Sequence, residues 1–116
     1  MSVVRIVANL ATADVQGVAA FYSDLLSLNI LMDMGWIVTL GGDEMAPVQL
    51  SVASSGGSGS PVPDLSIQVS DLAEIFERAE AMGVPLAYPL TEEPWGIRRF
   101  MVHDPMGRLI NITEHI

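Results

Sequence analysis

Arg98 and Arg99 are adjacent in a segment that favours a β-strand, and Asp64 begins another such segment. Successive side chains on a strand point to opposite faces, so one arginine can bind a substrate carboxylate or enolate while the other points away. Asp64 can act as a general base if the apolar residues of its strand bury it. Trp95 lies in the polar turn 92–96, where no core requires a large ring, so we expect it to contact a ligand.

Other kinds of chemistry find no support in the sequence. It contains no nucleophile paired with a base, no phosphate-binding glycine loop and no dinucleotide fingerprint. The absence of cysteine excludes disulfides, thiolate catalysis and zinc–thiolate centres, and it is compatible with a cytoplasmic location. A formal net charge of -9, from 14 acidic residues and 5 arginines, argues against nucleic acid and anionic membranes as partners. No stretch reaches the roughly 18 apolar residues of a membrane span, and we expect no signal peptide.

The apolar patterns predict the elements that must position these residues. Asp14 and Asp71 are suited to cap two helices, which end near Leu26 and Met82. Strands are expected at 3–10, 28–32, 36–40, 47–53, 64–69, 86–90, 96–103 and 108–114.

The order strand, helix, strand, strand, strand therefore occurs twice, and the two helix caps lie 57 residues apart (71 minus 14). This repeat predicts a single α+β domain, 1–116, made of two βαβββ modules. The modules span 1–54 and 61–116, and we expect the Gly/Ser segment 55–60 to be a flexible linker.

The chain resembles the vicinal oxygen chelate superfamily, which includes glyoxalases, bleomycin resistance proteins and extradiol dioxygenases. In the first module the resemblance rests on NLATADVQGVAAFYSDLLSL, with its acidic helix cap and Phe-Tyr pair. In the second it extends from Leu65 to Glu114 and is most specific from Glu93 to the turn 104–107. The resemblance implies a cupped mixed sheet, with the ligand site in the cup.

In metal-dependent members of this superfamily, four ligands, typically His and Glu, come from the first and last strand of each module. The corresponding residues here are Val7, Asp64 and Asn111, and either Gln49 or Ser51. Valine cannot bind a metal and an amide is a weak neutral donor. We therefore expect no metal and no other cofactor.

Superfamily members without a metal bind small molecules, and bleomycin resistance proteins sequester cationic, aromatic drugs. The resemblance thus implies a metal-independent protein that binds a cationic or aromatic small molecule by aromatic stacking and a negative field. The expected ligand-binding residues are Trp36, Asp64, Trp95, Arg98, Arg99, Phe100 and Asn111.

Two alternatives remain open. One is a lyase, isomerase or dioxygenase-like enzyme that acts on a small carbonyl or carboxylate substrate. The other is an interaction module whose adaptable apolar surface includes the methionines Met32, Met34, Met45 and Met101. Because the edges of a cupped sheet need covering, we expect a homodimer under each alternative.

Overall fold

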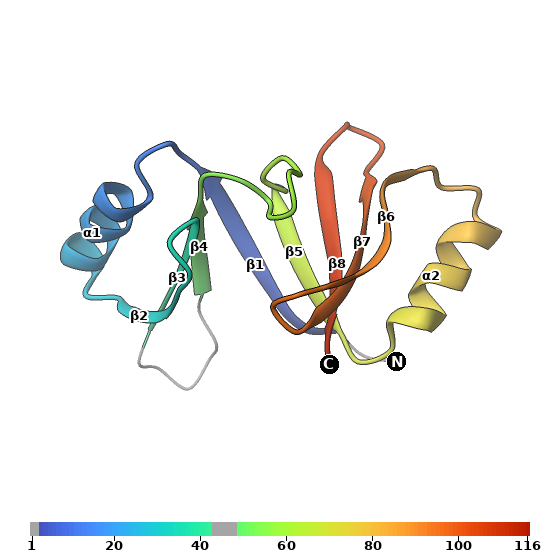
Figure 1. Ribbon diagram of the computed structural model, residues 1–116, viewed down its shortest axis with the longest axis horizontal. Coiled ribbons are helices and arrows are strands. Elements are labelled where there is room, and N and C mark those ends of the chain that lie inside the picture. Colours follow the sequence, from blue (N-terminus) through green and yellow to red (C-terminus); the bar gives the residue numbers. More distant parts are fainter. Residues whose placement is uncertain (1–2, 43–48) are drawn as a thin grey trace. The chain divides into compact units, whose positions relative to one another are not determined.

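The computed structural model describes residues 3–42 and 49–116 of the chain. These residues form eight strands and two helices (Figure 1). The helices are α1 (Val15–Leu26) and α2 (Leu72–Ala81). The strands are β1 (Val3–Ala11), β2 (Asn29–Asp33), β3 (Ile37–Gly41), β4 (Gln49–Ala53), β5 (Leu65–Val69), β6 (Leu86–Glu93), β7 (Ile97–His103) and β8 (Leu109–His115).

The strands belong to one mixed sheet with the order β2-β3-β4-β1-β5-β8-β7-β6. The predicted α+β fold, with its repeated βαβββ series, is confirmed. The strand expected at 47–53 is seen from Gln49 onward, while residues 47 and 48 and Met45 lie outside the described residues. Neither described helix, of 12 and 10 residues, is long and apolar enough to cross a membrane.

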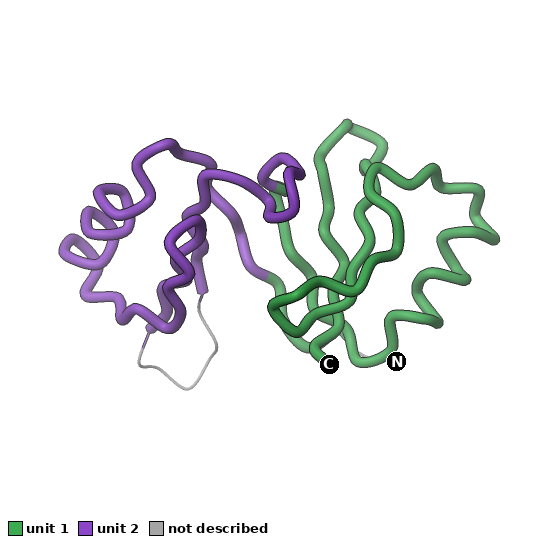
Figure 2. Tube along the Cα trace, viewed as in Figure 1, with its two compact units in different colours: residues 1–6, 63–116 green, residues 7–62 purple. Residues whose placement is uncertain are grey.

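The chain divides into two compact units (Figure 2). Unit 1 comprises residues 1–6 and 63–116, and unit 2 comprises residues 7–62. The first residues of β1 thus group with the second half of the chain, because a strand contributes to the unit with which its backbone pairs and packs.

In unit 2, β2, β3 and β4 are antiparallel neighbours, and β1 runs parallel to β4. Helix α1 covers one face of this group, where Val15 and Ala19 pack on Val38 and Leu40 of β3. Burial of these side chains is the main favourable contribution to docking the helix, about 25 cal/mol for each Å² of apolar surface removed from water.

The apolar stripe of α1 is narrower than its sequence suggests. Leu25 and Leu26 continue the helical spacing of apolar residues, but both are exposed, Leu25 by 64%. Helix α1 ends at Ser27, whose left-handed backbone (φ 54°) turns the chain toward β2. The last turn of the helix therefore leaves its leucines outside the core.

In unit 1, β6, β7 and β8 are antiparallel neighbours, and β5 runs parallel to β8. The side chain of Asp71 accepts a hydrogen bond from the Glu74 N–H and caps α2, as predicted. Helix α2 covers one face of this group, and its core contains Val69, Leu72 and Phe100.

The segment expected to be a flexible linker forms a closed, hydrogen-bonded loop. The Gly56 N–H donates to the Ser60 carbonyl (2.8 Å), and the Ser60 N–H and hydroxyl both donate to the Gly57 carbonyl. A Cβ at Gly56 would lie 2.1 Å from the Pro61 carbonyl oxygen. Glycine is needed there because the loop folds tightly on itself, and low-complexity composition does not reveal this.

Candidate functional site

The second half of the chain places a buried cation on the sheet face of unit 1 opposite α2. Alternation along β7 sends Arg99 to this face and its neighbour Phe100 to the face under α2. The Arg99 side chain is only 2% exposed. We call the face that carries Arg99 the inner face of unit 1.

Arg98 lies on the opposite face from Arg99. Its guanidinium is 3.7 Å from the Glu114 carboxylate, which also accepts a hydrogen bond from the Leu72 N–H at the start of α2. Both arginines were expected to bind ligand, and strand geometry keeps only Arg99 on the inner face. Arg98 contributes to the exposed surface beside α2.

Phe100, also among the expected ligand-binding residues, belongs to the core under α2, on the face opposite Arg99. It is fully buried, and its ring meets the ring of Phe76 edge to face, with 5.3 Å between centroids. It also lines a crevice of about 200 Å³ under α2. Seven of the eight lining residues are apolar, so the crevice offers few polar groups to orient a ligand.

The β6–β7 hairpin brings an anion to Arg99. Gly96, with φ +88°, allows a tight turn in which its N–H donates to the Glu93 carbonyl. The turn aligns Glu93 with Ile97 and Thr91 with Arg99, so Glu93 and Arg99 are diagonal neighbours. Their carboxylate and guanidinium are 2.6 Å apart, and both side chains are buried.

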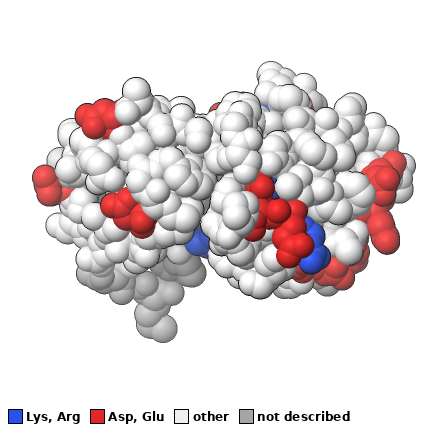
Figure 3. Space-filling model, viewed as in Figure 1, with Lys and Arg blue, Asp and Glu red and all other residues white. Residues whose placement is uncertain are grey.

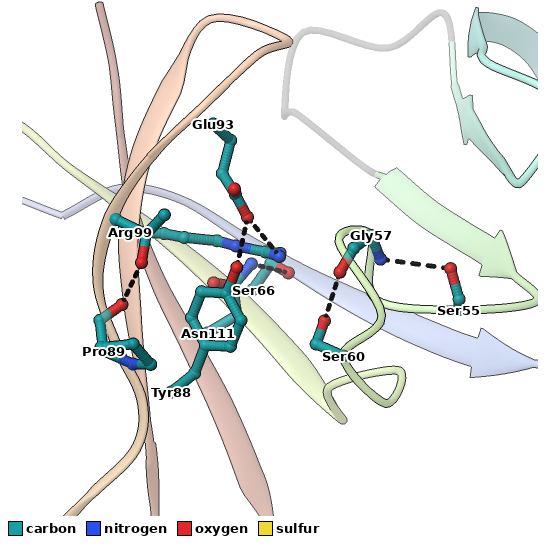
Figure 4. A network of polar contacts seen from close by, with 10 residues as sticks. Ser55, Gly57, Ser60, Ser66, Tyr88, Pro89, Glu93, Arg99 and Asn111 are labelled. Atoms are coloured by element: carbon teal, nitrogen blue, oxygen red, sulfur yellow. Dashed lines mark hydrogen bonds and ion pairs between the residues drawn. The ribbon is translucent and has the colours of Figure 1, made fainter.

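Two aromatic rings enclose this ion pair. The Arg99 guanidinium lies 4.7 Å from the Tyr88 ring centroid and 5.2 Å from that of Trp95. The Tyr88 hydroxyl donates to the Glu93 carboxylate at 2.9 Å (Figure 4). The Glu93 carboxylate therefore binds the Arg99 guanidinium, and the Tyr88 hydroxyl hydrogen-bonds to that carboxylate. The two rings pack against the guanidinium and restrict its orientation.

Asn111 occupies the same inner face, on β8. It is 5% exposed and pairs with Ser66 of β5, whose hydroxyl accepts a hydrogen bond from the Asn111 amide at 3.2 Å (Figure 4). Among the described residues, no group donates to the Asn111 Oδ1. The Asn111 Oδ1 is thus a buried acceptor without a donor in this orientation of the amide.

Asp64 does not join this group. Its N–H donates to the Leu109 carbonyl and its carboxylate accepts from the Leu109 N–H, both at 2.8 Å. The side chain is exposed, which contradicts the condition of burial under which a general base was expected. The residue beside Asn111 is Ser66, two positions later on β5.

Unit 2 contains counterparts of Ser66 and Asn111. Subtracting the repeat length of 57 residues from the number of Ser66 gives Asn9. Asn9 aligns with Ser51 of β4, so Ser51 matches Asn111, and Gln49 lies two positions earlier. The Ser51 hydroxyl is buried and lies 2.8 Å from the hydroxyl of Thr39. The alternative left open between Gln49 and Ser51 is decided by this register.

Trp36 belongs to unit 2, whereas the other expected ligand-binding residues belong to unit 1. It precedes β3, and its carbonyl accepts a hydrogen bond from the Ser54 N–H at 3.0 Å. The structure thus assembles Arg99, Trp95 and Asn111 within one unit.

Sequence reasoning did not identify Glu93 and Ser66 as site residues. Glu93 could have been found as the acidic residue six positions before Arg99 across a Trp-Gly turn. Ser66 could have been found from the period of two along its strand, which places it on the same face as Asp64.

The residues at the superfamily's metal-ligand positions do not fit a divalent metal. In unit 2 they are Val7, which has no donor, and Ser51, whose hydroxyl is engaged with Thr39. In unit 1 they are Asp64, engaged with a backbone N–H, and the Asn111 amide. Across residues 3–42 and 49–116, no three His, Cys, Asp or Glu side chains are grouped as a metal site requires.

Comparison with solved structures shows a shared fold. A superfamily member from Vibrio splendidus 12B01 is 22% identical (TM-score 0.67; 99% of this chain and 100% of that chain covered). Methylmalonyl-CoA epimerase from Mycobacterium tuberculosis is 20% identical (0.63; 98% and 87%). A Legionella pneumophila structure described as NAD-dependent benzaldehyde dehydrogenase is 15% identical (0.79; 97% and 100%). At these identities the likeness concerns the fold alone.

No curated protein matches the chain. The model of the Glyoxalase/Bleomycin resistance protein/Dioxygenase superfamily matches residues 3–112, nearly the whole length. The chain therefore belongs to the glyoxalase/bleomycin resistance protein/dioxygenase superfamily.

Proposed function

We propose that this protein binds a small planar organic molecule at the inner face of unit 1, without a metal at the superfamily positions. The observation that carries the proposal is the buried Arg99–Glu93 pair between Tyr88 and Trp95. Removing two charges from water costs several kcal/mol, and apolar residues can often replace such a pair without loss of stability. Stability alone therefore does not account for the pair, and buried charge clusters are typical of functional sites.

The geometry favours an aromatic ligand over a cationic one. The faces of Tyr88 and Trp95 are directed at the Arg99 guanidinium, so the cation of this site is supplied by the protein. A second cation would meet the charge of Arg99, whereas a neutral ring or an aromatic carboxylate would not be repelled by it. Trp95 is partly exposed and can offer stacking area beside the buried pair.

A thermal-shift screen tests this proposal with three matched sets of compounds: neutral aromatics, aromatic carboxylates and aromatic amines. We expect stabilisation by the first two sets and its loss in Trp95→Ala. Phe21→Ala removes an exposed ring in unit 2 and is the control that should retain stabilisation. Stabilisation only by the amines, or equal behaviour of the two variants, would contradict the proposed ligand class.

A separate experiment tests the proposal that the protein binds no metal. Elemental analysis of the purified protein is expected to find no stoichiometric divalent metal. A metal bound at one per chain and lost in Asp64→Ala or Asn111→Ala would overturn this part of the proposal.

An enzyme is the second candidate, favoured by the buried Glu93 carboxylate beside a phenol and a guanidinium. Such a carboxylate can exchange a proton with a small carbonyl or carboxylate substrate, as a lyase or isomerase requires. Two structural neighbours, from Mycobacterium tuberculosis and Streptomyces coelicolor, are methylmalonyl-CoA epimerases. NMR spectra of a stabilising compound incubated with the protein distinguish binding from catalysis. Conversion of the compound by the wild type, lost in Glu93→Gln while binding is kept, supports the enzyme.

The remaining expectations concern location and partners. We propose a cytoplasmic protein, because a chain without cysteine requires no oxidising compartment. The net charge of -9 supports the expectation that neither nucleic acid nor an anionic membrane is a partner.

A further inference from the structure

Asn111 lies on the inner face of unit 1, on a strand between β5 and β7. It is aligned with Ser66 of β5 on one side and with Met101 of β7 on the other. The next inward-facing residue of β8, Thr113, is aligned with Arg99, so Asn111 and Arg99 are diagonal neighbours. Diagonal neighbours in a sheet are about 7–8 Å apart, so one small aromatic molecule can contact both side chains.

The two ends of the Asn111 amide have different surroundings. The nitrogen donates to the Ser66 hydroxyl at 3.2 Å, whereas Oδ1 receives no hydrogen bond from the part of the chain that the structure describes (Figure 4). The side chain is 5% exposed, so bulk water does not supply the missing donor. Buried acceptors are nearly always hydrogen-bonded in folded proteins, because an unsatisfied one costs free energy. A donor on a bound molecule would remove this cost.

The residue on the neighbouring strand explains why this acceptor stays unsatisfied. Met101 is aligned with Asn111, is 1% exposed, and has a thioether that donates no hydrogen bond. In unit 2 the counterpart of Asn111 is Ser51, which is aligned with Thr39 of β3, and the two hydroxyls are 2.8 Å apart. The repeat thus pairs the buried polar group in unit 2 and leaves an acceptor available in unit 1.

We infer that Asn111 determines ligand specificity by accepting, at Oδ1, a hydrogen bond from a donor on the aromatic ligand, such as a ring N–H. This inference rests on the proposed function and narrows its ligand class. A ring that stacks on Trp95 beside Arg99 directs one edge toward Asn111, and the unbranched Met101 side chain adapts to it. A ligand edge with only acceptors would face Oδ1 unpaired and bind more weakly.

Two pairs of planar compounds with nearly the same shape test the inference. Indole and benzofuran are the neutral pair, and indole-2-carboxylate and benzofuran-2-carboxylate are the anionic pair. In each pair a ring oxygen, an acceptor, replaces the ring N–H donor. We expect the wild type to bind the N–H compounds about tenfold more tightly in isothermal titration calorimetry. Equal binding within both pairs, or tighter binding of the benzofurans, would overturn the inference.

Variants assign the preference to Asn111. Asn111→Leu removes the acceptor but keeps a side chain of similar size, and it should bind the two members of each pair equally. Asn111→Ala is a second variant with the same expectation, and circular dichroism confirms that each is folded. The control is Thr39→Val, which removes a buried hydroxyl from unit 2 and should keep the preference. A preference that persists in folded Asn111→Leu or Asn111→Ala would contradict the role of Asn111.

The same measurements distinguish failure of this inference from failure of the proposed function. Binding of both members of a pair that is lost in Trp95→Ala, without a preference for the N–H compound, supports the aromatic site and contradicts the role of Asn111. If neither pair binds to the wild type, the proposed ligand class is wrong and the inference fails with it.

Discussion

At the scale of single residues, Arg99 is the side chain on which the inner face of unit 1 depends. Its guanidinium contacts the Glu93 carboxylate at 2.6 Å and lies against two aromatic rings. Both charges are removed from water, so each is stabilised mainly by the other. The two residues therefore form one energetic unit.

Replacing one member of the pair should be much more damaging than replacing both. We expect Arg99→Met or Glu93→Gln to lower the free energy of unfolding by about 3–5 kcal/mol, because an unpaired charge stays buried. The double variant Arg99→Met/Glu93→Gln should be more stable than either single variant. Urea unfolding measures all three, and strictly additive losses would contradict the coupling.

Arg98→Met is the matched control for these variants. Its pair with Glu114 is partly exposed, and such pairs contribute about 0–1 kcal/mol. A loss as large as that of Arg99→Met would mean that burial does not distinguish the two arginines.

Asp104 makes stability depend on pH at the turn between β7 and β8. Its pKa lies below the ordinary 3.8 because the Arg108 N–H donates to the carboxylate, with further contributions from the Met106 N–H and the Arg108 guanidinium. A lowered folded-state pKa means that the stabilisation is complete above the ordinary pKa and is lost as the pH falls through the folded-state value.

Asp104→Asn should therefore be less stable than the wild type at pH 7, and the difference should shrink below about pH 4. Thermal unfolding of both proteins from pH 7 to pH 2 measures the difference. A gap that does not change with pH would show that the charge of Asp104 is unimportant.

At the scale of elements, the two ends of α1 show why its sequence departs from an ideal helix. The Asp14 carboxylate accepts a hydrogen bond from the Gly17 N–H, and a Cβ at Gly17 would lie 2.1 Å from the other carboxylate oxygen. The absence of a side chain at Gly17 thus makes room for the Asp14 cap. Ser27 has a left-handed backbone that glycine adopts without strain.

Two substitutions in α1 should therefore have unequal effects. Ser27→Gly should raise the free energy of unfolding by about 1 kcal/mol, because it relieves the left-handed conformation. Gly17→Ala should bring no gain: the helix propensity of alanine contributes about 1 kcal/mol, and displacement of the cap costs about as much. Thermal unfolding checks both, and a clear stabilisation by Gly17→Ala would contradict the role assigned to Asp14.

At the scale of the whole molecule, negative charge opposes self-association. The chain carries a formal net charge of -9, and Figure 3 shows carboxylates scattered over the visible surface of both units. Two copies of the chain therefore repel each other.

Salt should consequently favour association between copies of the chain. Raising the ionic strength from about 0.01 M to 0.15 M shortens the Debye length from about 30 Å to 8 Å and screens the repulsion. Sedimentation at both salt concentrations is expected to show a lower dissociation constant at the higher one. Weakening of self-association by salt would indicate contacts held by ion pairs and would contradict this expectation.

Much of the fold could be predicted because the signals that specify its helices, strands and turns involve residues close together in the sequence. Strand alternation, helix caps at Asp14 and Asp71, and turn residues are short-range signals, and their repetition after 57 residues (71 minus 14) indicated two modules. The resemblance based on this repeat and its motifs is confirmed by the family model that matches residues 3–112.

The candidate site could not be predicted in the same way, because it depends on the pairing of strands and the packing of a helix that are far apart in the sequence. The sequence by itself determined that Arg98 and Arg99 face opposite sides, but only the packing of α2 on Phe100 decided which arginine is buried. In the register of β5 against β8, the residue opposite Asn111 is Ser66 and not Asp64. Register and burial are set by the contacts of distant segments, so residue types and spacing leave them undetermined until the chain is folded.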